Sequence, residues 1–358
     1  MTAQQIVDPS RIEAELLKIW EPLAKENKMR ASLFNLIIFN KLSQRTDYIR
    51  KIVEKVVEKF PCRTLFISED SSAGQNYLKT AVSVLFPGAT ENAFACDQID
   101  IGVAGANLHQ VPSLLLPHLV PDLPIYLLWG EDPSQDHPLF EPLSQLAHRL
   151  IFDSEATDNL PAFAAKLLDL NEKEGFEIAD LNWARTEGWR DLLASVFQPS
   201  ERREALSTLS SVSFVHNSRT TESFCHLKIQ SMYLLAWLAS RLQWKWLTTD
   251  KAPFFTLQGA KNRVEAQIQT ARHEKLGPGT VISVDLTWEN HHFFAARLSD
   301  QYHVVKVELS SHESCDLPYH YVLGQTATGQ SLVKEICTKG TSTHYLGMLR
   351  QLRDQKLC

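Results

Sequence analysis

The residues of this sequence whose types and spacing could do chemistry are glycines, carboxylates and histidines. A dinucleotide-binding turn needs glycines that let backbone N–H groups approach a pyrophosphate at the start of a helix. The nearest candidate, GVAG at Gly102–Gly105, has two glycines instead of three, and no acidic residue follows at the expected distance after another strand. The segment GEDPSQDH, residues 130–137, has one glycine and three carboxylates that would repel phosphate. We therefore predict no bound dinucleotide and no other cofactor.

Three carboxylates, Asp132, Asp136 and Asp153, follow the ends of predicted strands, where α/β enzymes often place catalytic groups. No GxSxG, HExxH or P-loop motif accompanies them. No catalytic residue is therefore predicted. The alternative hypothesis is a small-molecule or nucleotide-binding enzyme with a site at the strand ends near Asp132 and Asp153.

The histidines lack the spacing of metal ligands. His291 and His292 are adjacent on a predicted strand, so their side chains should point to opposite faces. His312 and Cys315 are three residues apart in a predicted loop, with no second pair of ligands nearby. We predict no metal site.

The six cysteines are widely spaced, and no two form a CxxC pair, which is typical of free thiols in a reducing compartment. They are Cys62, Cys96, Cys225, Cys315, Cys337 and Cys358. The first thirty residues lack the apolar segment of a signal peptide. The longest apolar run, residues 232–239, is far shorter than the roughly 20 residues that span a bilayer. We expect a cytoplasmic protein with no membrane partner.

The charge balance argues against nucleic-acid binding. The formal net charge is −6, and no cluster of Lys and Arg stands out. Sequence-independent binding to nucleic acid needs such a cluster to displace counterions from phosphates. We expect no nucleic-acid partner.

The segment WARTEGWRDLL, within a predicted amphipathic helix over 180–197, is the candidate binding surface. Arg185 and Trp189 share one helical face, and Trp183 and Arg190 share another. Arg over Trp is a favourable cation–π pair, and both residue types dominate protein–protein hot spots. These four residues form the predicted partner-binding set. The alternative is that they lock the helix onto its own fold; we expect both tryptophans to be structural and Arg190 to be exposed.

Alternating helices and strands precede this helix, which is typical of an α/β domain with a mostly parallel sheet flanked by helices. Asp8-Pro9 is a good helix start, with a capping carboxylate followed by proline. Residues 77–86 and 96–105 alternate like an antiparallel pair added to the sheet. Further strands are predicted over 31–39, 63–69, 125–129 and 149–154, and helices over 12–23, 43–60, 111–119, 137–150 and 160–171.

Four prolines interrupt VPSLLLPHLVPDLPIYLLWG, residues 111–130. Pro121 and Pro124 should end the predicted helix over 111–119, because proline lacks an N–H and restricts the residue before it. The five apolar residues that follow suit a buried strand over 125–129, entered through a stiff turn.

A break at QPS, residues 198–200, suggests the domain boundary. We expect an N-terminal α/β domain over 1–198 and a C-terminal α+β domain with an antiparallel sheet over 199–358. In the second domain, helices are predicted over 222–243, 331–337 and 342–355, and strands over 263–271, 280–288, 292–298 and 303–309.

Three ordered segments carry a resemblance to a known family. They are VPSLLLPHLVPDLPIYLLW, RLIFDS and DLNWARTEGWRDLL, and LAWLASRLQWKW fits the same family's second domain. Together they resemble OpcA, the glucose-6-phosphate dehydrogenase assembly protein family, over roughly residues 8 to 300. The resemblance implies a non-catalytic role in the oxidative pentose phosphate pathway, as an assembly or allosteric activator protein. It also implies glucose-6-phosphate dehydrogenase as the partner.

Overall fold

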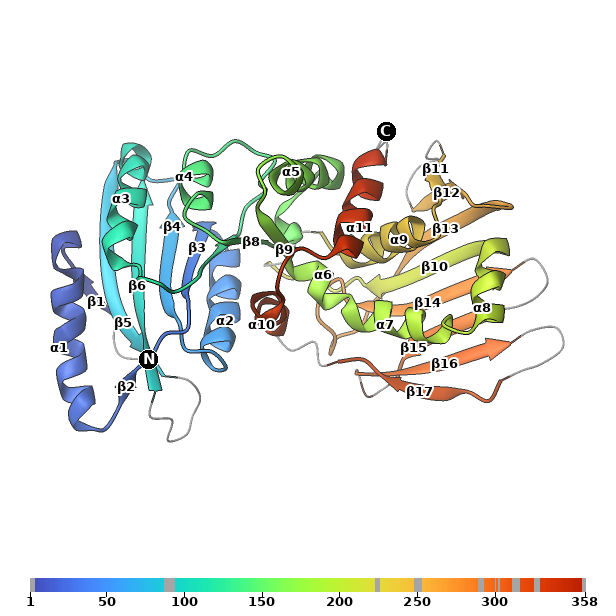
Figure 1. Cartoon of the computed structure of the whole chain (residues 1–358), viewed down its shortest axis with the longest axis horizontal. Coiled ribbons are helices and arrows are strands. Elements are labelled where there is room, and N and C mark those ends of the chain that lie inside the picture. The colour runs from blue at the N-terminus through green and yellow to red at the C-terminus, as the bar shows by residue number, and fades with distance from the viewer. Residues whose placement is uncertain are drawn as a thin grey trace. The chain divides into compact units, whose positions relative to one another are not determined.

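The computed structural model shows two compact units whose segments alternate along the chain (Figure 1). The first unit comprises Met1–Asp153, Leu170–Leu181 and Ala327–Gly340, and the second comprises Ser154–Asp169, Asn182–Thr326 and Thr341–Cys358. The boundary between residues 198 and 199 stays a prediction. The structure describes residues 4–86, 94–222, 226–247, 253–288, 293–299, 301, 303–310, 316–324 and 329–355.

The first unit contains a mixed, mostly parallel sheet, as predicted. Its strands lie in the order β1-β5-β6-β4-β3-β7-β8-β9, and β2 pairs with β6. Among the described strands of this sheet, the β1–β5 and β5–β6 pairs are antiparallel and the other pairs are parallel. The strands are β1 Gln5–Val7, β2 Met29–Arg30, β3 Asn35–Lys41, β4 Arg63–Glu69, β5 Tyr77–Leu85, β6 Phe94–Ala104, β7 Ile125–Trp129, β8 Arg149–Phe152 and β9 Glu177–Asp180.

Helices of the first unit begin and end near the predicted residues, with one clear exception. The helix predicted over 137–150 is shortened to α4, Phe140–Ser144, and the last two predicted residues belong to β8. Asp8 caps the first turn by accepting a hydrogen bond from the Ser10 amide, as its position predicts. The other helices are η1 Pro9–Arg11, α1 Ile12–Lys25, α2 Arg45–Val57, η2 Gly105–Gln110, α3 Val111–Leu115, η3 Leu116–His118 and α10 Gln330–Cys337.

The helix α10 completes the core of the first unit, although it is nearly two hundred residues beyond β8 in sequence. It packs beside α2 (Figure 1), and its apolar residues join the core that α2 forms with β3 and β4. Arg149, 2% exposed, donates to Glu335 at 3.0 Å and to the Gly340 carbonyl at 2.7 Å. This buried pair fixes α10 to the start of β8.

The second unit contains an eight-stranded sheet in the order β11-β12-β13-β10-β14-β15-β16-β17. The prediction of an antiparallel sheet holds except for one parallel pair, β10 with β13. Four of these strands, β10, β11, β12 and β17, were not predicted. The strands are β10 Leu209–Asn217, β11 Lys245–Trp246, β12 Phe254–Gln258, β13 Arg263–Ala271, β14 Val281–Trp288, β15 Phe293–Leu298, β16 Val304–Ser310 and β17 Tyr319–Val322.

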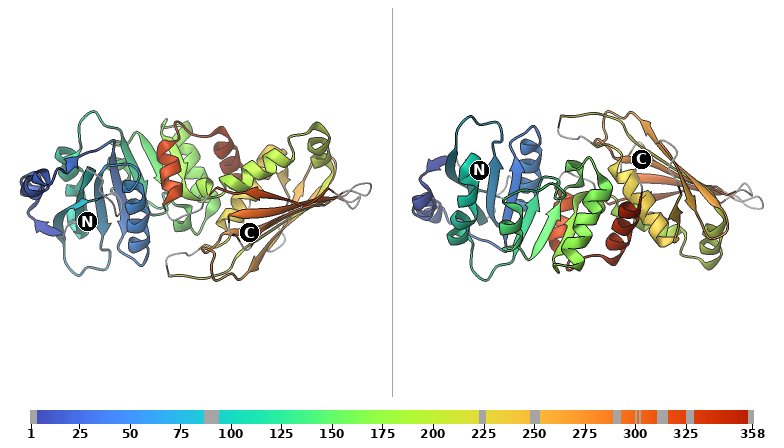
Figure 2. Two further views of the ribbon diagram at one scale, coloured as in Figure 1. Left: turned by 90° about the horizontal axis from the view of Figure 1, so that it is seen from below. Right: turned by 90° about the horizontal axis from the view of Figure 1, so that it is seen from above.

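The helix α9, Ile229–Arg241, lies along one face of this sheet (Figure 2). Every residue from Ile229 to Ala239 is buried, because the helix α11, Thr343–Asp354, packs against it as well. A helix that is buried all round needs apolar residues on every side. Of the longer helix predicted over 222–243, Ser223–Cys225 lie outside the described residues. The remaining helices are η4 Ser154–Ala156, α5 Leu160–Glu172, α8 Ser200–Ala205 and η5 Leu206–Thr208.

The single helix predicted over 180–197 is wrong in two respects. Its first residue, Asp180, ends strand β9, and the helical part divides into α6, Leu181–Arg185, and α7, Glu187–Val196. The division falls at Thr186, whose hydroxyl donates to the carbonyls of Asn182 and Trp183 at 3.0 and 3.1 Å. A threonine side chain that bonds back to the preceding turn bends a helix.

Candidate functional site

The sheet of the first unit has a switch point between β3 and β7, where ligands of α/β proteins usually bind at the carboxyl ends of the strands. The chain between β3 and α2 therefore occupies the position of a phosphate-binding turn. It is the segment LSQ, residues 42–44, and it contains no glycine. Gly130, which follows β7, allows close packing here, since a Cβ atom would lie 2.9 Å from the Phe39 carbonyl oxygen.

Three consecutive amides at the end of β3 and the start of this turn are already hydrogen-bonded within the chain. Lys41 donates to a carboxylate oxygen of Glu131 at 2.8 Å, Leu42 to the Glu69 carbonyl at 2.6 Å, and Ser43 to the Thr46 hydroxyl at 3.1 Å. Burial raises the pKa of Glu131, against the lowering effect of the Lys41 amide. A pyrophosphate needs free amides and no adjacent carboxylate, so the residues at this edge do not fit a dinucleotide.

The glycines of GVAG also have structural roles. Gly102 lies within β6, and Gly105 adopts a positive φ of 59° at the start of η2. A Cβ atom at Gly105 would collide with the side chain of Asn76, which accepts a hydrogen bond from the Ala106 amide at 3.1 Å. These glycines shape the chain reversal after β6.

A histidine that the sequence did not single out lies at the same edge. His137 packs against Phe39 and Trp129, whose rings stack at 4.2 Å. Its Nδ1 accepts from the Leu139 amide at 3.2 Å, so its Nε2 carries the hydrogen and donates to Glu69 at 2.7 Å. Both ring nitrogens are therefore engaged in orienting the segment after β7. Its position shortly after a strand end was the signal available in the sequence.

The two carboxylates of the alternative hypothesis also have partners in the fold. Asp132 accepts from the Ser134 amide at 2.8 Å and stabilises a turn. Asp153, 2% exposed, accepts from Arg45 at 2.8 Å. The structure places both residues at the carboxyl edge of the sheet, as predicted. Their carboxylates bind groups of the protein itself, a turn amide and Arg45.

The four predicted partner-binding residues lie on α6 and α7 in the second unit. Trp183 and Trp189 are buried, at 7% and 4% exposure, and Arg185 is half-buried. The Arg190 guanidinium lies 3.4 Å from the centroid of the Trp183 ring, which confirms that these two residues share a face. Arg190 is only 8% exposed, so the expectation that it is exposed is wrong.

Arg190 is buried because its guanidinium has partners inside the fold. Its Nη1 donates to the Trp183 carbonyl at 2.7 Å and to the Thr186 hydroxyl at 2.6 Å. The ring of Tyr345 from α11 also packs against Trp183, with 5.3 Å between the ring centroids. The helical period correctly grouped the side chains by face, but the layer that covers that face comes from distant sequence.

Within the residues that the structure describes, no group of three or more His, Cys, Asp or Glu side chains could hold a metal ion. His291, His292, His312 and Cys315 lie outside those residues. In the same described part of the chain, no helix is long and apolar enough to cross a membrane.

Comparison with known proteins gives the family. Residues 53–169 match the N-terminal domain, and residues 176–345 the C-terminal domain, of the family described as glucose-6-phosphate dehydrogenase subunit, OpcA. The chain belongs to the OpcA family. The resemblance of the proline-rich and tryptophan-rich segments is thereby confirmed.

Individual OpcA relatives match part of the chain. A protein of Synechocystis sp., provisionally named OxPP cycle protein OpcA, is 28% identical over 197 residues, which cover 54% of this chain and 39% of the relative. A protein of the same name from Nostoc punctiforme is 26% identical over 204 residues, covering 56% of this chain and 42% of the relative. The matches thus span about two fifths of the length of these OpcA relatives.

A solved structure with a similar fold is an enzyme. The 3-ketoreductase KijD10 of Actinomadura kijaniata, solved with TDP-benzene and NADP, gives a TM-score of 0.51 with 10% sequence identity. The alignment covers 90% of this chain and 95% of the ketoreductase. At this identity the likeness concerns the fold of the OpcA chain alone.

Proposed function

We propose that this chain is a non-catalytic partner of glucose-6-phosphate dehydrogenase, which it assembles or activates allosterically by protein–protein binding in the cytoplasm. The observation that carries this proposal is the match of both OpcA domains, which together extend over residues 53–169 and 176–345. The relatives' provisional name, OxPP cycle protein, points to the same pathway.

The chemistry of the carboxyl edge supports a non-catalytic role. The enzyme with a similar fold was solved with NADP, but in this chain the Lys41 amide is bonded to Glu131, and the Leu42 and Ser43 amides are bonded to Glu69 and Thr46, where a pyrophosphate would lie. His137, Asp132 and Asp153 each hold part of the fold. The residues at this edge therefore give no support to the alternative hypothesis of a nucleotide-binding enzyme.

We retain α6 and α7 as the proposed partner-binding element. Three of the four residues are buried, namely Trp183, Trp189 and Arg190. We propose that they hold α6 and α7 in the conformation that binds the partner. Arg185 is half-buried and donates to Asn182 at 2.9 Å. Among the four, we propose Arg185 as the side chain that touches the dehydrogenase.

The test combines association and activity. The purified chain should form no NADPH from glucose 6-phosphate and NADP by itself. Mixed with the dehydrogenase of the same organism, it should co-elute in size-exclusion chromatography with light scattering, and it should change the rate of NADPH formation. Arg185→Ala should weaken this association, whereas Lys173→Ala, at an exposed position, is the matched control.

Two results would contradict the proposal. Turnover by the chain alone, in a preparation free of dehydrogenase, would make it an enzyme. Absence of both co-elution and any rate change would remove the dehydrogenase as its partner. Normal association of the Arg185→Ala protein would exclude only the proposed contact.

A further inference from the structure

A pocket of about 450 Å³ opens in the first unit at the opposite edge of the sheet from the switch point. It lies where β3 and β4 begin, and its volume is within the usual range for small-molecule sites. Its polar side chains come from four separate segments: Glu13 on α1, Arg30 on β2, Arg63 at the start of β4, and Asp97 on β6.

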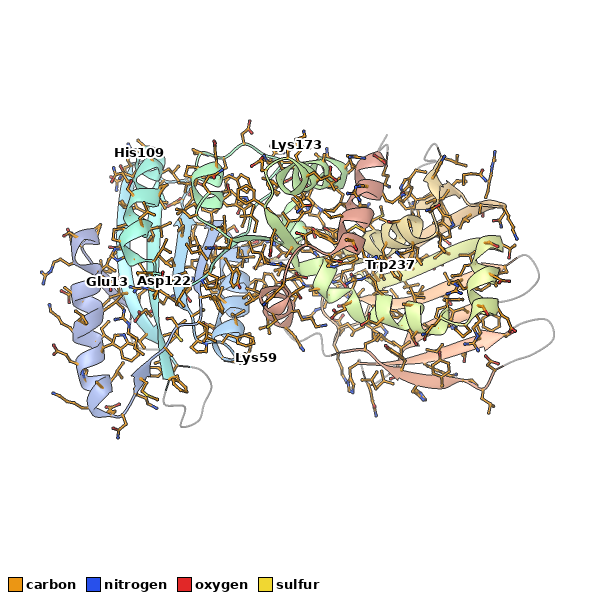
Figure 3. All side chains as sticks on the ribbon, viewed as in Figure 1. Glu13, Lys59, His109, Asp122, Lys173 and Trp237 are labelled. Atoms are coloured by element: carbon orange, nitrogen blue, oxygen red, sulfur yellow. The ribbon has the colours of Figure 1, made fainter. Side chains whose placement is uncertain are left out.

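The apolar wall of the pocket is the proline-rich segment that marks the family. Pro117, Leu119 and Pro121 line it. The side chain of Asn35, the first residue of β3, fixes this wall by donating to the Val120 carbonyl at 3.0 Å and accepting from the Val120 amide at 2.8 Å. The wall is thus rigidly tied to the sheet, and a turn at Asp122 follows it (Figure 3).

Two arginines supply the positive charge and the hydrogen-bond donors of the pocket. Arg63 is 5% exposed, and its Nε is buried with no hydrogen-bond partner. Arg30 is about one-third exposed at the mouth. Arg30 donates through Nε to Asp97 at 2.8 Å, and Asp97 also accepts from the indole of Trp20 at 2.7 Å. Asp97 is therefore held by Arg30 and Trp20, and Arg63 Nη1 lies 3.8 Å from it. The Nε of Arg63 remains as an unused donor.

The carboxylate of Glu13 lies close to both arginines at the exposed side of the pocket. Its carboxylate contacts Arg63, lies 3.7 Å from Arg30 and accepts from His118 at 2.9 Å. Burial acts to raise the pKa of Glu13, but the hydrogen bond from His118 and the charge of Arg63 outweigh it and lower the pKa. Glu13 is therefore ionised at neutral pH. With 41% of its side chain exposed, on a surface helix (Figure 3), it can swing away without opening the core.

We propose that this pocket binds a small molecule through a phosphate monoester group, which takes the place of the Glu13 carboxylate. Once Glu13 is displaced, Arg30 and Arg63 face a single carboxylate, Asp97, so the pocket has an excess of positive charge. A phosphate has three terminal oxygens and can meet Arg30, Arg63 and His118 together, whereas a carboxylate has only two. The site consists of other residues than the proposed partner-binding element, and its proposed ligand does not depend on the dehydrogenase.

The test is calorimetric titration of the chain with inorganic phosphate, with chloride adjusted to constant ionic strength. A competing internal carboxylate lowers the apparent affinity by the fraction of molecules in which it occupies the site. We therefore expect Glu13→Gln to bind phosphate about tenfold more tightly than the wild-type chain. Arg30→Gln should bind about tenfold more weakly, since it loses one charge-assisted contact. Glu21→Gln, at an exposed carboxylate on the same helix, should leave the affinity unchanged.

A titration with acetate distinguishes a phosphate site from a carboxylate site. Acetate should bind more weakly than phosphate to every variant. The proposal is overturned if Glu13→Gln binds phosphate no more tightly than the wild-type chain, or if Arg30→Gln binds it equally well. Tighter binding of acetate than of phosphate would overturn the choice of ligand. If Glu13→Gln fails to fold, as judged by circular dichroism, the Arg30→Gln titration decides alone.

Discussion

The burial of Arg190 leads to a sharp prediction for the substitution Arg190→Ala. The substitution removes two hydrogen bonds, to the Trp183 carbonyl and the Thr186 hydroxyl, together with the stacking of the guanidinium on the indole. It also leaves a void beside the Trp183 ring, which packs against Tyr345 as well. The junction between α6 and α7 should therefore loosen.

The size of the effect follows from these contacts. A hydrogen bond from a charged donor contributes about 1.5–3 kcal/mol, and a desolvated cation–π contact about 2 kcal/mol. These contributions overlap, because all of them depend on one side chain. We therefore expect Arg190→Ala to lower the free energy of unfolding by about 3–5 kcal/mol, which is less than the plain sum of these contributions.

Urea denaturation followed by tryptophan fluorescence and circular dichroism measures this loss. The two signals must coincide for one free energy to apply, because the chain has two compact units. Arg185→Ala is the matched control and should cost about 1 kcal/mol, since Arg185 is only half-buried. Arg190→Lys should fall between them, because it keeps the charge without the planar stack. An Arg190→Ala protein within about 0.5 kcal/mol of the wild type would refute this account of the helix pair.

Two further predictions concern titratable groups. Burial, with a smaller effect of Lys228, lowers the pKa of His216 from 6.5 to about 4, so the unfolded chain takes up a proton that the folded chain excludes. Stability should fall as the pH decreases from about 6.5 to about 4, and His216→Phe should flatten this part of a denaturation series; an unchanged slope would contradict the assignment. Burial also raises the pKa of Cys62 and raises that of Cys96 to about 11, while Cys337 is exposed. Iodoacetamide should therefore modify Cys337 of the native chain long before Cys62 and Cys96, as peptide mass spectrometry would show, and equal rates at the three thiols would argue against this packing.

Local sequence was sufficient wherever the structure depends on neighbours in the chain. Pro124 and the apolar run after it predicted β7 at Ile125–Trp129, because proline and apolar continuity act over a few residues. Asp8-Pro9 predicted the helix start for the same reason. The family segments predicted the OpcA assignment that the domain matches bear out.

Strand pairing could not be predicted in the same way. The strand β10 alternates at Val212 and Phe214, but its place in the middle of the sheet, parallel to β13, depends on pairing with residues more than fifty positions away. The packing of α10 against α2 likewise joins residues far apart in sequence. A short stretch of sequence does not show such contacts. Bringing distant residues together costs chain entropy, and only the contacts of the complete fold offset that cost.

The same distinction applies to the sites. Sequence alone determined that Trp183 and Arg190 share a helical face, because seven residues make nearly two turns. Only the tertiary structure decided that this face is covered, by Tyr345 from α11, and that Arg190 is buried. The pocket where β3 and β4 begin depends even more on the tertiary structure. Its charged residues are Glu13, Arg30, Arg63 and Asp97, and His118 is hydrogen-bonded to Glu13. They are isolated in sequence, and they meet because the parallel order of β3, β4 and β6 brings the starts of separate segments to one edge of the sheet.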